Sequence, residues 1–256
     1  MTRHRSLTVV LTAALSCAAP HFAHADIEGW QQVEMRVPLI STPTPAFPRL
    51  SLRVYGEGRE AGRFAGLYDS YLRVGPLFWV APFLFIGVHG TLEGTRTAGG
   101  CAEGASPTCG AYVFEFRAEL EPNFFGRLGP FTFNDRNRLE FRWRESGMRY
   151  RYRNQLRVNL QPPRWRVYPF VMEEALFDFS EGFNQNRATA GVAIDIRPGT
   201  RLDVGYTLRS RQTPATAGQP ATWAHDHIVL LTFFVDLAAA EAARAKPLSA
   251  VVRTSS

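Results

Sequence analysis

Lysine is almost absent from this chain: Lys246 is the only one, although lysine and arginine together number 29 among 256 residues. A soluble β-sandwich has a polar face rich in Lys, Ser and Thr as well as Arg, so this composition disfavours such a surface. Residues 1–25 contain Arg3 and Arg5, so their removal lowers the formal net charge from +6 to +4. This mild balance specifies no acidic partner, and without a recognisable motif we expect no nucleic-acid binding.

Long hydrophobic runs are also missing. The apolar run from Leu7 to Ala19 is shorter than the roughly 20 residues that a helix needs to span a bilayer. A short basic region precedes this run, and Ala23-His-Ala25 follows it as a small-x-small cleavage site. These features predict a signal peptide over residues 1–25, with cleavage near Ala25, and they place the mature protein beyond the inner membrane.

Cysteine occurs only three times, and Cys17 falls within the predicted signal peptide. Cys101 and Cys109 flank a Gly-rich loop with no histidine nearby, so the spacing gives poor support to a metal site. In an oxidising compartment the two residues predict a disulfide that closes this loop. We expect neither a metal ion nor a cofactor.

Three successive segments, 112–120, 138–144 and 149–160, alternate apolar and charged residues. Side chains of a strand point alternately to its two faces, so each segment has one apolar and one charged face. Together with the signal peptide, this pattern predicts strands with one face in lipid and the other in a lumen. The candidates for lining a pore or forming interior salt bridges are Glu115, Arg117, Glu119, Arg138, Glu140, Arg142, Arg144, Arg149, Arg151, Arg153 and Arg157.

Strand-like segments fill the mature chain, and many are longer than the usual 5 or 6 residues, as tilted membrane strands of about 9 to 11 residues are. The candidates are 27–37, 48–57, 62–74, 78–95, 111–121, 134–145, 148–160, 166–177, 187–196, 200–211 and 223–237. Short turns, Gly75-Pro76 among them, alternate with longer loops such as 96–110, which is typical of outer-membrane barrels. We expect an all-β fold over residues 26–237: a single antiparallel transmembrane β-barrel of about 10–12 strands. A C-terminal tail, 238–256, is expected to be periplasmic and partly disordered, beginning with a short helix.

Eleven candidate strands conflict with the even counts of bacterial single-chain barrels. We therefore expect a twelfth strand, or else a ten-stranded barrel separated from its N-terminal element by the Pro-rich stretch Pro38–Pro48. The tryptophans lie mostly near predicted strand ends and predict aromatic belts at both membrane interfaces. The alternative is that the aromatic residues form an ordinary sandwich core.

Several short segments, taken in order, carry a resemblance to a known family. They are Asn137–Glu140, Arg151–Arg153, Glu173-Glu174, Phe183–Arg187, Gly191, Leu202–Tyr206, Trp223 and Asp226-His227. In these the chain resembles the bacterial domain of unknown function 2490 family, most strongly from about residue 110 to 237. The resemblance implies a secreted outer-membrane β-barrel and brings no activity or catalytic residue. Such barrels usually end on an aromatic closing strand, whereas here Leu237 is followed by the tail.

The excess of arginine on the charged faces predicts a narrow pore for small anionic or polar solutes. The alternative is a filled structural barrel in which the arginines pair with Glu115, Glu119, Glu121 and Glu140. Barrels near eight strands are filled and those of sixteen or more are channels, so the strand count leaves both open. A third possibility is a scaffold that binds an adhesive partner through its outer loops.

A lipid-modifying enzyme is the least favoured alternative, and we expect no enzymatic activity. His225, Asp226 and His227 lie beside a predicted outer loop, and Ser210 or Ser180 could supply a nucleophile, but nothing in their spacing shows that they converge. The expected location is the outer membrane of a Gram-negative bacterium. The expected partners of this monomer are outer-membrane lipids, lipopolysaccharide and the barrel-assembly machinery.

Overall fold

The computed structural model describes residues 27–40, 50–60, 66–96, 110–213 and 221–245. The predicted signal peptide, the Cys101–Cys109 loop and the end of the tail lie outside the described residues. The described elements are β1 (Ile27–Ile40), β2 (Leu50–Glu60), β3 (Leu67–Ala81), β4 (Leu84–Arg96), β5 (Tyr112–Leu128), β6 (Phe131–Arg144), β7 (Gly147–Leu160), β8 (Val167–Asp178), β9 (Gly182–Arg197), β10 (Thr200–Thr213), β11 (Thr222–Asp236) and α1 (Leu237–Ala245).

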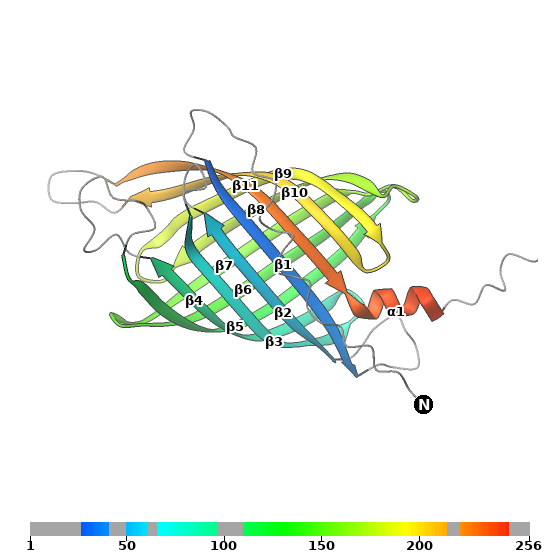
Figure 1. The fold of residues 1–256 in the computed structure, drawn as a ribbon, viewed down its shortest axis with the longest axis horizontal. Coiled ribbons are helices and arrows are strands. Elements are labelled where there is room, and N and C mark those ends of the chain that lie inside the picture. The colour runs from blue at the N-terminus through cyan, green and yellow to red at the C-terminus, as the bar shows by residue number, and fades with distance from the viewer. Residues whose placement is uncertain (1–26, 41–49, 61–65, 97–109, 214–220, 246–256) are drawn as a thin grey trace, which may run out of the picture.

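The eleven strands form one closed barrel, in which each strand pairs with its sequence neighbours (Figure 1). This architecture confirms the predicted all-β barrel class. The pattern that predicted it is local: β-branched, aromatic and apolar residues alternate with polar ones, which suits a sheet with unlike faces. The helix α1 continues directly from β11 at one end, which we call the α1 end; the opposite end is the far end (Figure 1).

The barrel closes through a parallel pair of strands. β1 and β11 run side by side in the same direction, with a register that extends from Ile27 opposite His227 to Arg36 opposite Asp236 (Figure 1). All other pairs are antiparallel, and with an odd number of strands the first and last must then point the same way. The expectation of a twelfth strand was therefore wrong, as was that of a ten-stranded barrel with a separate N-terminal element.

Gly75 and Pro76 lie inside β3, so the turn predicted there is wrong. A Cβ on Gly75 would lie 2.0 Å from the backbone oxygen of Val88, which shows how closely β3 and β4 approach at this point. Glycine in a strand interior often marks such a close backbone approach. The actual turn between these strands is at Pro82-Phe83.

β5 and β6 also extend further than the sequence indicated. The predicted strands are 111–121 and 134–145, but β5 continues to Leu128 and β6 starts at Phe131. A tight turn with Gly129 at φ +57° joins them. A position with positive φ suits glycine, because a Cβ would be strained there.

The outer surface of the barrel is apolar. Exposed large side chains project from almost every strand, among them Leu72, Val88, Phe116, Leu120 and Val171. Soluble monomers rarely expose a continuous apolar surface of this extent. Within the residues described, no helix is both long enough and apolar enough to cross a membrane.

Trp30 departs from the predicted aromatic belts. Its side chain is only 3 % exposed and packs inside the barrel with Ile228 and Leu230, whereas Trp143, Trp165 and Trp223 are exposed. Alternation places Trp30 on the same face of β1 as Gln32, Glu34 and Arg36, and all four line the lumen.

Candidate functional site

An ion-pair cluster around Glu115 lies at the far end of the lumen. Arg142 donates to both carboxylate oxygens of Glu115 at 2.5 and 2.9 Å. Arg117 and Arg144 bind the same carboxylate, and Arg117 also pairs with Glu93 from β4. Glu115, Arg117 and Arg142 are each less than 10 % exposed. These side chains come from β4, β5 and β6 and pack against one another, so the lumen is narrow at this end.

A second cluster occupies the middle of the lumen, between β2 and β6. Glu121 accepts hydrogen bonds from Arg53 and Arg138, both at 2.6 Å. Glu119 forms ion pairs with Arg73 at 2.7 Å and with Arg138 at 3.4 Å. Each carboxylate is thus shared by two arginines, so this layer is compact.

A third cluster joins β6, β7, β8 and β9. Arg153 bridges Glu140 and Glu174 with hydrogen bonds of 3.0 and 2.6 Å, and Arg187 binds Glu174 at 2.9 Å. Arg151 lies 3.9 Å from Glu140. Breaking a buried pair of this kind leaves an uncompensated charge, so the clusters fix the register of the strands that carry them.

The residues named from the alternation do not all belong to one site. Glu115, Arg117, Glu119, Arg138, Glu140 and Arg142 are buried in the clusters. Arg151, Arg153 and Arg157 are partly buried, with side chains 11–17 % exposed. Arg144 and Arg149 lie at the rim of the far end, 38 % and 39 % exposed. There Arg149 pairs with the exposed Glu181 at 2.9 Å, away from the lumen.

Sequence reasoning missed half of the lumen. Its further charged residues include Glu34, Arg36, Arg53, Glu57, Arg59, Arg73, Arg136, Glu174, Arg187, Arg201, Asp203 and Arg209. In β2 the period-two signal was present, since Arg53, Glu57 and Arg59 share one face. It was weakened because Gly56 and Gly58 stand on the other face where apolar side chains would have marked it.

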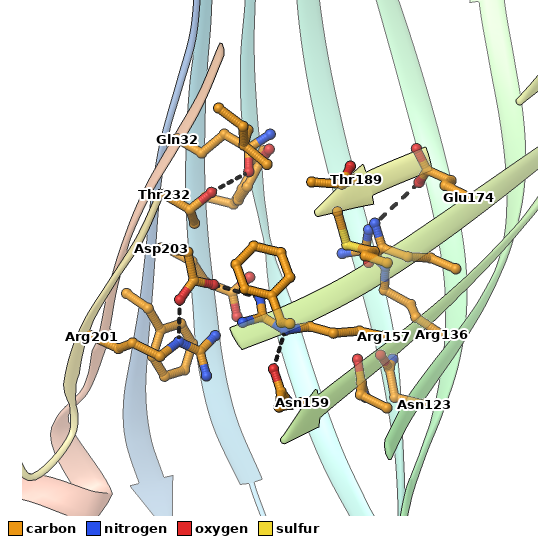
Figure 2. A pocket seen from close by; sticks show the side chains of 18 of the residues that line it. Gln32, Asn123, Arg136, Arg157, Asn159, Glu174, Thr189, Arg201, Asp203 and Thr232 are labelled. Carbon is orange, nitrogen blue, oxygen red and sulfur yellow. Dashed lines mark hydrogen bonds and ion pairs between the residues drawn. The ribbon is translucent and has the colours of Figure 1, made fainter. Parts of the chain in front are cut away.

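A cavity of about 660 Å³ extends from the middle clusters to the α1 end. Its wall contains eleven arginines and five carboxylates, so the lining is cationic. Figure 2 shows Arg136 and Arg157 projecting into it beside Asn123 and Asn159. Towards the α1 end exposure rises, from 2 % for the side chain of Arg138 to 28 % for that of Arg201. The cavity is therefore accessible to solvent from this end.

Among the arginines of the cavity wall that are not exposed, Arg136 is the least neutralised. Its nearest carboxylates are Glu174 at 3.7 Å and Glu121 at 4.0 Å, beyond hydrogen-bond distance. Both of these carboxylates are already bound by two other arginines at 2.5–2.9 Å. Arg157, on the neighbouring strand, leaves its Nη2 without a hydrogen-bond partner. Arginine forms bidentate hydrogen bonds with carboxylate and phosphate, so these two side chains can bind an anion.

A possible metal-ligand group within the described residues is His89 with Glu119 and Glu121. One ligand atom from each lies within 4.8 Å of the others, and all three side chains are buried. Neither ring nitrogen of His89 has a hydrogen-bond partner. However, both carboxylates are occupied by arginines, and a further cation would be repelled by these charges. The donor set therefore does not fit a metal ion well.

The histidines suggested for lipid chemistry lie on the outer surface near the far end. Ser210 Oγ is 2.9 Å from His225 Nδ1, and Tyr206 contacts His227. Asp226 points inward instead and binds Arg209 at 2.8 Å, so it cannot orient His225. Ser180 bonds to Asp178 at 2.6 Å, away from either histidine. Among the described residues the structure thus brings together a Ser–His pair and no triad.

Fold and site together define a closed β-barrel with an apolar outer surface and an ion-paired, arginine-rich lumen. The chain belongs to the family described as Protein of unknown function (DUF2490), whose model matches residues 28–219. The predicted family resemblance is thereby confirmed. No curated protein and no solved structure matches the chain.

Proposed function

We propose that this protein is an outer-membrane β-barrel that serves as a narrow passage for small anionic or polar solutes, entered through the cationic cavity at the α1 end. The apolar outer surface supports the membrane location, because a lipid bilayer is the environment that such a surface requires. In this arrangement the α1 end, where two-residue turns join β3 to β4, β5 to β6 and β9 to β10, faces the periplasm. Lipids and lipopolysaccharide then contact the outer surface.

The observation that carries the proposal is the incomplete neutralisation of Arg136 in the cavity wall, since both carboxylates near it are already bound by two other arginines. Fixed positive charge in a lumen attracts anions and disfavours cations. Beyond the cavity, an anion meets the Glu115 cluster, which narrows the path. We therefore expect a low conductance, with each anion moving from one arginine to the next along the passage.

The test is the conductance of the refolded protein in a planar bilayer with a salt gradient across it. We expect small steps and a reversal potential of the sign given by anion preference. Arg136→Gln should bring that potential closer to zero. Arg149→Gln is the matched control, since Arg149 lies at the rim and is paired with exposed Glu181. Cation preference, or no conductance from demonstrably folded protein, would contradict the proposal and favour a filled structural barrel.

A lipid ester hydrolase is a second candidate, and the single observation in its favour is the contact between Ser210 and His225. Serine attack on an ester needs such a base within hydrogen-bond distance. Acyl-ester hydrolysis that Ser210→Ala abolishes, in protein of unchanged fold, would support it. Without such loss the pair is a polar contact at the membrane interface.

A further inference from the structure

The cavity has two unlike walls. One wall, formed by β8, β9, β11 and β1, carries two apolar clusters: Trp30 with Ile228 and Leu230, and Tyr168 with Phe170 and Ala193. Met172 packs against both clusters and joins them into one surface. Trp30, Tyr168, Phe170, Met172 and Leu230 all line the cavity. Apolar side chains facing a water-filled lumen are unexpected, because the lumen side of a membrane barrel is normally polar.

Glycines keep this apolar wall flat. A Cβ on Gly191 would lie 2.7 Å from the ring of Phe170, and one on Gly205 would lie 3.4 Å from it. The ring therefore lies directly over the backbone of β9 and β10. The ring meets the cavity with little of its surface: Phe170 is only 3 % exposed, and a guanidinium lies over the ring.

The wall formed by β5, β6 and β7 is polar and cationic. It contributes Arg136, Arg138, Arg153 and Arg157, together with the amides of Asn123 and Gln155. Arg136 and Arg157 are diagonal neighbours, since Arg157 is opposite Asn134 in the register of β6 and β7. Arg157 also lies over the ring of Phe170, with its guanidinium carbon 4.0 Å from the ring centroid. Arg157 forms an ion pair with Asp203 at 2.5 Å, but this carboxylate is shared with Arg201, so the cationic wall that borders the apolar one keeps a net positive charge.

We propose that the cavity binds amphipathic organic anions: molecules that join one carboxylate or phosphate group to a compact apolar or aromatic body. The anionic group binds Arg136 and the neighbouring Arg157, which shares Asp203 with Arg201. The apolar body lies against Met172, which is only partly buried and joins the two apolar clusters. This inference rests on the proposed function, because it uses the same cavity and the same entry. A volume of about 660 Å³ suits a ligand of this size, since small-molecule sites typically measure about 300–1,000 Å³.

Fluorine NMR of the full-length protein in nanodiscs tests both halves of the site. The probes are 4-fluorobenzoate, which has both parts, trifluoroacetate, which has almost only the anion, and fluorobenzene, which has only the ring. We expect 4-fluorobenzoate to bind about tenfold more tightly than either of the others, since each wall contributes to its affinity. Empty nanodiscs give the signal that arises from lipid alone.

Two substitutions separate the walls. Arg136→Gln should weaken 4-fluorobenzoate binding about tenfold and leave fluorobenzene unchanged, because it removes a charged hydrogen bond. Met172→Gln keeps the side-chain volume, and it should weaken 4-fluorobenzoate binding severalfold while leaving trifluoroacetate unchanged. Arg136→Lys, which retains the charge, should recover part of the affinity. Gel mobility before and after heating checks that each variant is folded.

The possible results distinguish this inference from the proposed function. Equal affinity for 4-fluorobenzoate and trifluoroacetate, in a barrel that conducts anions, would overturn the inference alone. Binding of 4-fluorobenzoate that neither substitution alters would overturn it too, because the probe would then lie outside the cavity. Absence of anion preference in the bilayer, with 4-fluorobenzoate binding that depends on both walls, would overturn the passage and retain the site.

Discussion

Arg136 lies 3.7 Å from Glu174, although Glu174 is already held by Arg153 at 2.6 Å and by Arg187 at 2.9 Å. Three guanidinium groups thus surround one carboxylate inside the barrel. A single carboxylate can accept several hydrogen bonds but carries only one negative charge. The local excess of positive charge is therefore a property of this arrangement and not of the overall composition.

Neutralising this carboxylate should increase the anion preference of the lumen. Glu174→Gln keeps the shape of the side chain and removes the only charge shared by Arg153 and Arg187, so the reversal potential should move away from zero. This is the opposite direction to that expected for Arg136→Gln. A shift of the same sign in both variants would show that the potential reports general disorder of the lumen and not its charge.

Glu115 should matter far more for stability than a surface carboxylate. Glu115→Gln leaves buried Arg117 and Arg142 partly uncompensated, and breaking a buried ion pair costs about 3–5 kcal/mol. Glu181→Gln, which breaks an exposed pair with Arg149, should cost about 0–1 kcal/mol. Urea unfolding from lipid vesicles measures the two free energies. Similar values for both would mean that the far-end cluster contributes little.

The close approach of β3 and β4 makes Gly75 irreplaceable. Gly75→Ala places a Cβ against the Val88 backbone oxygen, which cannot move without breaking the ladder, so a loss of about 2 kcal/mol or more is expected. Gly126→Ala in β5 is the matched control, because a Cβ there meets nothing within 4 Å. Comparison of the refolded fraction and of the unfolding midpoint tests this. Equal losses of stability in the two variants would contradict the prediction that the close approach at Gly75 excludes a Cβ.

If the outer surface contacts lipid, a charge placed there should be costly in a depth-dependent way. Leu120 is exposed in the middle of β5, and Phe114 is exposed near its far end. We expect Leu120→Arg to cost about 2–4 kcal/mol and Phe114→Arg about 0–1 kcal/mol in vesicles. On a water-exposed surface neither substitution would have a large effect, so two small values would argue against a membrane-spanning barrel.

The parallel closure predicts where the start of β1 lies. Ile27 is opposite His227 in the register, at the far end, whereas Ile40 lies at the α1 end. With the native cysteines replaced by serine, Ile27→Cys and Thr222→Cys should react with a membrane-impermeant maleimide from the same side of the membrane. Ile40→Cys should react from the other side. Reaction of Ile27→Cys and Ile40→Cys from the same side of the membrane would contradict the parallel pairing of β1 with β11.

Much of the fold was readable because the side-chain period of a strand is local. Alternation separated an apolar from a charged face in β5, β6 and β7 and identified eleven strand segments, all of which have a counterpart in the barrel. The errors came from residue types that occur both in turns and inside strands. Gly75-Pro76 is a turn signal by composition, yet the pair lies inside a strand where two backbones approach closely.

In β5, β6 and β7 the sequence by itself determined which side chains face outward and which face the lumen, because neighbouring residues in an extended chain must point to opposite sides. Only the tertiary structure decided how the barrel closes and which arginines form no hydrogen bond with a carboxylate. Closure pairs Ile27 with His227. The carboxylates nearest to Arg136 are bound by arginines of other strands: Glu121 by Arg53 of β2, and Glu174 by Arg153 of β7. Such pairings depend on register and shear around the whole barrel, which no local pattern contains.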